Sequence, residues 1–339
     1  MPPSARPRAA MMDLPQIYAP VRGDLATLER LLQDALSQDE PFIGELVTHV
    51  LRTRGKQLRP AMVCLSALAC GGDAGSGPCL EVAGATELIH LASLIHDDVI
   101  DAAAVRRGQA SVNAVWGNQV AVLLGDYLFS KAFHLLARLH NADLAAGVAG
   151  ATVRMSQAEI QQIKYGNTPH TDERIYFEVI EGKTAHLFSA ACRCGALTAG
   201  PSGANAAALG EFGLEWGMAF QITDDALDLV GTAEQVGKPI GSDIQTGKVT
   251  LPVIYALAHA PGSDRRRLEE ILRSPDGDRA PQEAGEVNAI LARCGAVEHA
   301  FQVARVRAER AAASLARLPH SPARDSLQAL VEFVTVRTR

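Results

Sequence analysis

Apolar residues recur every three or four positions along most of this chain, and this spacing limits the fold more than any other feature. It continues through long segments that are separated by clusters rich in glycine, proline, asparagine and aspartate. A period of three to four puts apolar side chains on one face of a helix, whereas a half-buried strand needs strict alternation, which is missing here. The spacing predicts helices over residues 24–36, 42–51, 60–69, 80–101, 113–139, 143–165, 171–197 and 204–229.

Composition supports a mostly helical globular protein, because hydrophobic residues make up 47% of the 339 and aromatic residues only 5%. We expect a flexible tail over residues 1–20 and a single domain over residues 21–339. The opening residues lack the apolar core of a secretory signal, and no uncharged apolar run reaches about 18 residues. The sequence therefore predicts no transmembrane segment.

Charge and cysteine content narrow the partners and the compartment. The net charge of -6 comes with no basic block of the kind that follows nucleic acid phosphates, so nucleic acid is not an expected partner. The six cysteines form no CxxC pair, and most lie in apolar helical stretches. They are predicted to be reduced, buried thiols in a cytoplasmic protein, and a zinc site is the less favoured interpretation.

Two similar acidic motifs carry most of the functional signal: LIHDDVID at 94–101 and QITDDALD at 221–228. On a helix Asp97 and Asp101 share a face, and Asp98 lies beside them. Crowded carboxylates raise each other's pKa unless a cation neutralises them. Oxygen ligands without histidine or cysteine indicate Mg²⁺, which bridges to substrate phosphates and would polarise a diphosphate as a leaving group. A solvated acidic helix end is the alternative, which the apolar residues before each motif disfavour.

Basic residues that could bind a diphosphate occur in four further segments. Each has an ordinary explanation when taken alone, such as a lysine stem lying along an apolar surface. Together they match the need of a diphosphate for fixed positive charge. The last segment is glycine-rich and could form a mobile lid. These residues are Lys56 and Arg59 in GKQLRP, Arg106 and Arg107 in RRG, Lys183 beside Thr184 in EGKTAHLF, and Lys238 and Lys248 in GKPIGSDIQTGKVTLP.

Five segments resemble, in their order and spacing, the signatures of the trans-isoprenyl diphosphate synthases, closest to the long-chain, octaprenyl-type branch. They are GKQLRP, the first acidic motif with the RRG that follows it, GKTAHLF, the second acidic motif and GKPIGSDIQTGKVTLP. The likeness runs from about Tyr18 to the C-terminal segment LARLPHSPARDSLQALVEFVTVR. The resemblance implies an all-α fold, the isoprenoid synthase helical bundle around a central catalytic cavity. It also implies a homodimer that depends on Mg²⁺.

The resemblance further implies a role for each matching residue. Asp97, Asp98 and Asp101, with Asp224 and sometimes Asp225 and Asp228, would bind Mg²⁺ at an allylic diphosphate. Arg106, Lys183, Lys238 and Lys248 would contact that diphosphate, and Lys56, Arg59, His90 and Arg107 would bind isopentenyl diphosphate. Lys183, Thr184, Gln221 and Lys238 would form the catalytic group.

The implied reaction is a sequential head-to-tail condensation of isopentenyl diphosphate onto an allylic diphosphate such as farnesyl diphosphate. The allylic diphosphate ionises, the carbocation is attacked by the double bond of isopentenyl diphosphate, and a proton is then lost. No protein nucleophile is needed. The product would serve as a quinone side chain.

Small residues near the first acidic motif suggest a long product. Ala92 lies five residues before Asp97, about 7.5 Å along the helix, and Ser93 is next to it. In the family a bulky aromatic residue there is associated with short products, so the two resemble an open floor. We predict a product of about C35–C50. Phe129 and Phe133 are candidates for a deeper barrier, or ordinary core residues.

Other functions remain open at this point. A shorter-chain (C15–C20) synthase is the main alternative, followed by a subunit of a heteromeric synthase. A terpene cyclase would not need the second diphosphate site. A helical metal-storage protein is disfavoured because such sites use glutamate and ExxH motifs.

Overall fold

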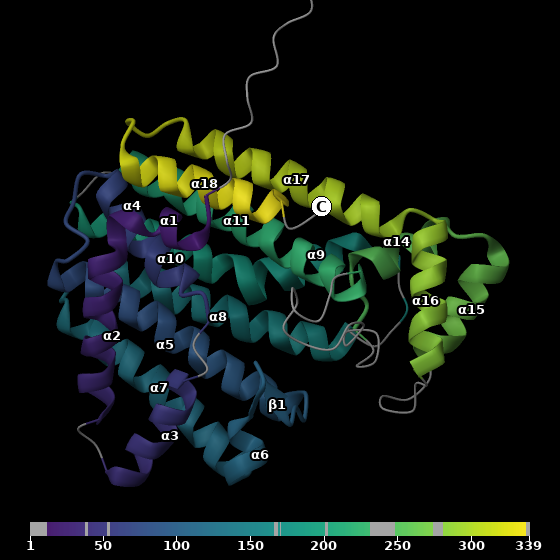
Figure 1. Ribbon diagram of the computed structural model, residues 1–339, viewed down its shortest axis with the longest axis horizontal. Coiled ribbons are helices and arrows are strands. Elements are labelled where there is room, and N and C mark those ends of the chain that lie inside the picture. Colours follow the sequence, from purple (N-terminus) through teal and green to yellow (C-terminus); the bar gives the residue numbers. More distant parts are fainter. Residues whose placement is uncertain are drawn as a thin grey trace, which may run out of the picture.

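The computed structural model describes residues 12–37, 40–52, 55–165, 169, 171–200, 203–230, 248–273 and 281–336. Nearly all of them are helical, which confirms the predicted all-α class (Figure 1). The first half contains α1 (Leu14–Ile17), η1 (Ala19–Val21), α2 (Arg22–Ser37), α3 (Pro41–Arg52), α4 (Leu58–Ala69), α5 (Gly77–Ile100), α6 (Val112–Trp116), α7 (Asn118–Arg138) and α8 (Ala142–Tyr165).

The second half continues the bundle. It contains α9 (Glu173–Ile180), the π-helical segment η2 (Glu181–Ala185), α10 (His186–Thr198), α11 (Gly203–Val230), α14 (Leu251–His259), α15 (Gly262–Arg273), α16 (Pro281–Arg293), α17 (Ala296–Leu315) and α18 (Pro322–Val336). The strands found among the described residues are β1 (Val105–Arg106) and β2 (Gln109–Ala110), which pair as an antiparallel hairpin.

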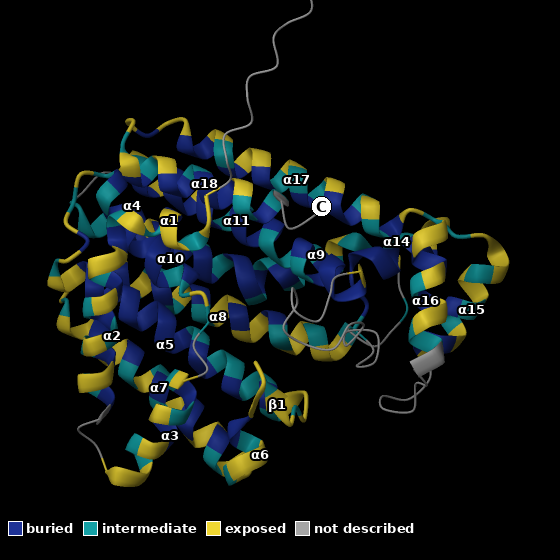
Figure 2. Ribbon diagram, viewed as in Figure 1, coloured by how far each residue is buried: buried dark blue, intermediate teal, exposed yellow. Residues whose placement is uncertain are grey.

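The centre of the bundle is formed by α5, α10 and α11, which are buried along most of their length (Figure 2). An aromatic group joins α10 and α11, since the Trp216 ring lies 4.9 Å from Phe188 and 5.2 Å from Phe220 between ring centroids. The indole of Trp216 donates a hydrogen bond of 2.9 Å to the Leu330 carbonyl, which attaches α18 to this group. Because α11 also contributes Ile222 to a second cluster with α14–α17, it spans both halves of the core.

The structure corrects the predicted elements at three places. The segment 113–139 is two helices, because Gly117 adopts φ +85° between α6 and α7. The segment 171–197 is interrupted by η2, and the chain after the first acidic motif turns through a short hairpin. Apolar periodicity continues across Gly117 and η2, so it could not reveal these two interruptions, whereas the hairpin lies between two predicted helices where no element was expected.

The predicted tail over residues 1–20 is wrong for its second half. Asp13 caps α1 in a reciprocal pair of hydrogen bonds with Gln16, and Ile17 is completely buried in the main core. Tyr18 donates a hydrogen bond of 2.7 Å to the Lys56 carbonyl. The segment therefore belongs to the folded bundle and contacts the loop that carries Lys56.

Within the described part of the chain, two helices, α5 and α7, are long and apolar enough to cross a membrane. In α5, 72% of the apolar window is buried inside the bundle, as in the core helix of a globular protein. In α7 this share is only 39%. Its outer side and that of α8 carry exposed apolar side chains, which we call the α7–α8 face: Val122, Leu123, Phe133, Val153, Ile160 and Ile163.

Candidate active site

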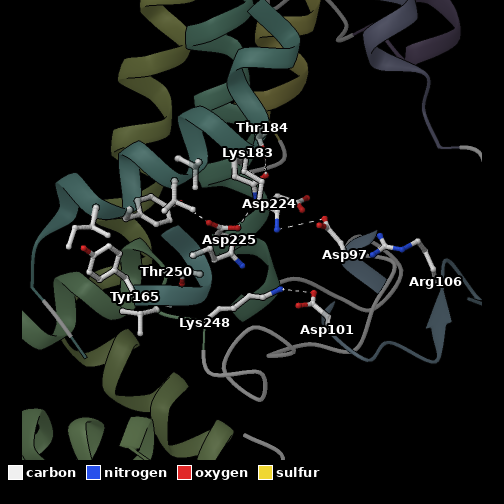
Figure 3. Close-up of a pocket in the computed structure, with 17 residues that line it drawn as sticks. Asp97, Asp101, Arg106, Tyr165, Lys183, Thr184, Asp224, Asp225, Lys248 and Thr250 are labelled. Atoms are coloured by element: carbon white, nitrogen blue, oxygen red, sulfur yellow. Dashed lines mark hydrogen bonds and ion pairs between the residues drawn. The ribbon is translucent and has the colours of Figure 1, made fainter. Parts of the chain in front are cut away.

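A cavity of about 220 Å³ lies where α5, η2 and α11 meet, and it brings most of the predicted acidic and basic residues together (Figure 3). Apolar side chains of α9, such as Ile175 and Val179, line the other side. The polar lining consists of Asp97, Asp101, Arg106, Gln162, Tyr165, Tyr176, Lys183, Thr184, Gln221, Asp224, Asp225, Lys248 and Thr250.

The first acidic motif forms the last turn of α5, with Asp101 as its C-cap. Asp97 and Asp101 face the cavity, as their spacing predicted. Asp98 is 4% exposed and is already bound by Arg106, whose Nε and Nη2 both lie 2.7 Å from Asp98 Oδ1. Asp98 therefore holds Arg106 at the cavity wall.

The negatively charged form of Asp97 is unfavourable at this position unless a cation neutralises it. The pKa of its carboxyl is raised to about 6, mainly by burial and also by the nearby carboxylates of Glu159 and Asp101, while Lys183 and Arg106 oppose this shift. The Lys183 ammonium lies 3.7 Å from Asp97 and 2.5 Å from Glu159. Burial by itself lowers the pKa of Lys183, but these carboxylates outweigh it and raise the pKa overall.

Lys248 neutralises the other cavity-facing carboxylate of this motif, at 3.1 Å between its Nζ and Asp101 Oδ2. Figure 3 shows it reaching across the cavity from the segment before α14 toward Asp101. The ammonium groups of Lys183 and Lys248 thus partly neutralise the carboxylates of Asp97 and Asp101, respectively. The predicted Lys238 lies outside the described residues.

The second acidic motif presents its three aspartates differently. Asp224 lines the cavity. Asp225 is 8% exposed and accepts hydrogen bonds of 2.7 Å from both Tyr176 and Gln221. Asp228 is completely buried and is not part of the lining. Asp224 is therefore the residue of this motif with the most direct access to a ligand.

A local π-helical turn positions Lys183 and Thr184. Gly182 packs so closely against α8 that a Cβ there would lie 2.6 Å from the Cβ of Ala158. A π-helical turn inserts one residue into a helix and often occurs at functional sites. Thr184 donates a hydrogen bond of 2.8 Å to the carbonyl of Gln221, so the predicted pair is in direct contact.

The predicted second anion site is a group of cations near the start of α4. Arg59 lies 4.2 Å from the centroid of the Phe188 ring, and its buried Nε has no hydrogen-bond partner among the described residues. Burial lowers the pKa of Arg59 to about 10, although Glu87 acts in the opposite direction. Burial and the charges of Arg59, Arg107 and Arg106 lower the pKa of His90 well below its ordinary value, so His90 is neutral at pH 7.

A glycine allows the second arginine of this group to approach. The guanidinium of Arg107 lies against Gly55, where a Cβ would be 2.5 Å from Nη2. Lys56 follows in the same loop, with its ammonium 5.4 Å from the Phe333 ring centroid. Lys56, Arg59 and Arg107, together with the neutral His90, thus form a cationic group, to which Glu87, 3% exposed, adds one negative charge.

The residues predicted to set product length lie in different environments. Ala92 is completely buried, whereas Ser93 is partly exposed and donates a hydrogen bond of 2.8 Å to the His90 carbonyl. Phe129 is half-buried, with its ring 5.7 Å from that of His96. Phe133 is 36% exposed on the α7–α8 face, so it is not a barrier inside a single chain.

The donor set fits an open magnesium site. Among the described residues no three aspartate, glutamate, histidine or cysteine side chains converge as a preformed metal cage. The cavity-facing donors are carboxylate oxygens, and the raised pKa of Asp97 reflects a cost that a divalent cation would relieve. Mg²⁺ commonly binds to one or two carboxylates, with water and phosphate oxygens completing its coordination.

Three residues near the site lie outside the motifs found in the sequence: Glu87, Glu159 and Tyr176. Glu159 sits on the inner side of α8 and binds Lys183, and Tyr176 binds Asp225. Glu87 is on α5 one turn before His90. An acidic residue on the buried side of a predicted helix was the available signal for both glutamates.

Comparison with known proteins identifies the family of this chain and the same fold in a solved structure. A sequence model of the family described as Polyprenyl synthetase matches residues 40–291. A short chain isoprenyl diphosphate synthase from Methanothermobacter thermautotrophicus is 41% identical over 85% of this chain and 88% of its own length. Heptaprenyl diphosphate synthase component 2 from Geobacillus stearothermophilus is 39% identical over 96% of this chain and 99% of its own.

A solved structure agrees over the whole bundle. The polyprenyl synthase from Caulobacter crescentus, crystallised with calcium and isoprenyl diphosphate, superimposes with a TM-score of 0.91. The two chains are 32% identical, and the match covers 97% of this chain and 99% of that one.

Proposed function

Because this chain belongs to the polyprenyl synthetase family, and to its long-chain branch, it is a prenyltransferase, and we propose that it extends an allylic diphosphate with isopentenyl diphosphate. The extension is an all-trans, head-to-tail condensation that repeats with each added unit. The observation that carries this proposal is the cavity in which Asp97 and Asp101 face Asp224 across the ammonium groups of Lys183 and Lys248.

The allylic diphosphate binds in this cavity. Asp97, Asp101 and Asp224 would hold Mg²⁺, which would supply positive charge to the departing diphosphate. Lys183, Lys248 and Arg106 bind the oxygens of the diphosphate. The resemblance assigns Lys238 to the same diphosphate and the remaining aspartates to Mg²⁺. Breaking of the carbon–oxygen bond leaves both electrons on the diphosphate and an allylic cation on the hydrocarbon.

The walls of the cavity protect that cation. Thr184 and Gln221 offer oxygen atoms close to the reacting carbons, and oxygen lone pairs stabilise positive charge. Ile175, Val179 and Ile180 exclude water, which would otherwise capture the cation as an alcohol.

Isopentenyl diphosphate binds to the cationic group of Lys56, Arg59, His90 and Arg107. The unpaired Nε of Arg59 supports this assignment, because a buried donor without a partner costs free energy that a phosphate oxygen would recover. Neutral His90 can donate to a phosphate without adding repulsion to the arginines. After the double bond attacks the cation, the released diphosphate takes the proton that is lost.

A product of about C35–C50 is the favoured length, on the basis of Ala92 and Ser93. A C15–C20 product is the second candidate, favoured by the relative from Methanothermobacter, whose name describes a short-chain enzyme. A long product would suit a quinone side chain and would be made by a cytoplasmic enzyme.

A homodimer is the proposed assembly, because the α7–α8 face exposes apolar side chains such as Leu123 and Ile160, each 67% exposed. A heteromer is the alternative, because the relative from Geobacillus is named as component 2 of its synthase.

The test is an incubation of the purified protein with farnesyl diphosphate, labelled isopentenyl diphosphate and Mg²⁺, followed by chromatography of the dephosphorylated products. We expect a ladder that ends between about C35 and C50 and disappears with EDTA. Products that stop at C20 would retain the reaction and reject the long-chain assignment. No elongation by the wild-type chain alone would reject the homomeric enzyme and favour a component that needs a partner.

A further inference from the structure

Tyr176 begins a chain of hydrogen bonds that runs along the cavity wall and connects three elements of the fold. Its hydroxyl, on α9, donates to Asp225 Oδ2 at 2.7 Å. Gln221 Nε2 donates to Asp225 Oδ1, also at 2.7 Å, and Thr184 donates to Gln221 Oε1 at 2.8 Å. The chain therefore joins α9, α11 and η2, and all four side chains line the cavity. Asp225 and Thr184 are labelled in Figure 3.

Carboxylate chemistry fixes the direction of this chain. A carboxylate oxygen only accepts hydrogen bonds, so the end of the Gln221 amide that faces Asp225 must be its NH₂ group. The reverse orientation would place two oxygens 2.7 Å apart. The carbonyl of Gln221 then faces Thr184, and because a carbonyl only accepts, the Thr184 hydroxyl must donate to it. The Thr184 oxygen can therefore offer lone pairs to the cavity.

Tyr176 makes this arrangement rigid. Gln221 contacts one oxygen of Asp225, Oδ1. The tyrosine hydroxyl fixes the second oxygen. Tyr176 and Asp225 are only 6% and 8% exposed, so little water is available to replace this bond. Hydrogen bonds to a buried charged group are among the stronger ones in proteins.

We propose that Tyr176 is a positioning residue: it anchors Asp225, and Asp225 acts through Gln221 to set the direction of the Thr184 hydroxyl. In this role Asp225 is a hydrogen-bond acceptor and not a magnesium ligand, whereas Asp224 is a ligand. The inference rests on the proposed function, since its effect on the reaction is read from condensation.

The first experiment replaces Tyr176→Phe and measures condensation kinetics. We expect kcat to fall about tenfold, while KM for each diphosphate changes less than twofold. Tyr255→Phe is the matched control, because it removes a hydroxyl from the same core cluster on α14, away from the cavity lining. Its kinetics should remain within twofold of wild type. Unchanged kcat in Tyr176→Phe would overturn the proposal.

A double-mutant cycle separates positioning from general packing. If Tyr176 acts through Thr184, then adding Tyr176→Phe to Thr184→Val should lower kcat less than twofold further. A second full tenfold loss would mean that the two residues act independently and would reject the proposal. Circular dichroism confirms folding, and Asp225→Asn replaces Tyr176→Phe in the cycle if the latter does not fold.

Metal binding gives a readout that does not depend on turnover. Calorimetry with Mg²⁺ and inorganic pyrophosphate should show weaker binding in Asp224→Asn and binding within twofold of wild type in Asp225→Asn and Tyr176→Phe. Equal weakening in Asp224→Asn and Asp225→Asn would reject the acceptor role. A wild-type protein that catalyses no condensation would count against the proposed function. An active wild type in which the kcat losses of Tyr176→Phe and Thr184→Val are additive would count only against this inference.

Discussion

The spacing of residues within a motif predicts some of the contacts between single residues in the cavity and misses others. The face shared by Asp97 and Asp101 follows from helix geometry, and the structure confirms that both line one cavity. The pairing of Tyr176 with Asp225 joins positions 49 residues apart and depends on how α9 packs against α11. A motif relates only residues that are close in the sequence, so motif spacing could not predict this contact.

Asp97 also leads to a prediction about pH. Its folded-state pKa of about 6 is above the ordinary value near 3.9, so the folded protein binds this proton more tightly than the unfolded chain. The resulting stabilisation is fully present below about pH 4 and is lost as the pH rises through about 6. In EDTA at pH 7, Asp97→Asn should therefore increase the free energy of unfolding by about 1–3 kcal/mol, because Lys183 keeps Glu159 as a partner.

Urea denaturation at pH 7 and pH 4 measures this effect. The gain in Asp97→Asn should vanish at pH 4, where the wild-type carboxyl is already protonated in the folded state. Asp34→Asn, an exposed position on α2, serves as the control and should change stability little at either pH. A gain of equal size at both pH values would contradict the electrostatic explanation.

At the scale of elements, long helices with continuous periodicity are the best predicted. Residues 143–165 and 204–229 were expected to be helical, and α8 and α11 differ from those ranges by one residue at their ends. The break at Gly117 needed a φ of +85°, and the π-helical turn of η2 depends on the close contact of Gly182 with α8. Both interruptions preserve the apolar period, and therefore neither changes the pattern that predicts a helix.

The geometry of α5 refines the prediction of product length. Partly exposed positions on this buried helix include His90, Ser93, Leu94 and Asp97, whose spacing of three and four marks one face; Glu81, His96 and Val99 are partly exposed as well. Ala92 points elsewhere in this register and is completely buried. We expect Ser93→Phe to stop elongation early, because its ring would extend from the same face as Asp97.

Product chromatography compares the two positions directly. Ser93→Phe should shift the ladder to C15–C20, and Ala92→Phe should also shorten it, with a loss of stability from overpacking of about 1–3 kcal/mol. Ser93→Ala is the control and should retain the wild-type ladder. Full-length products from both phenylalanine variants would reject the open floor near the first acidic motif.

For the whole molecule, the proposed dimer depends on the exposed apolar side chains of the α7–α8 face. Only 39% of the apolar window in α7 is buried in a single chain, and Leu123 and Ile160 are each 67% exposed. An apolar surface of this kind is stabilised by a partner that removes it from water. Phe133, a candidate for a barrier or for an ordinary core residue in the sequence, belongs to this surface because its side chain is 36% exposed.

If two copies cover this surface, a charge placed in its centre should separate them, since interface cores are depleted of charged residues and an unpaired buried charge is costly. Sedimentation equilibrium should give a dimer for the wild type and a monomer for Leu123→Glu at micromolar concentration. Val306→Glu changes an exposed apolar residue on α17, outside the α7–α8 face, and should remain dimeric. A monomeric wild type, or a Leu123→Glu variant that still dimerises, would show that this face does not join two copies, and the exposed side chains of α7 would then need a different partner.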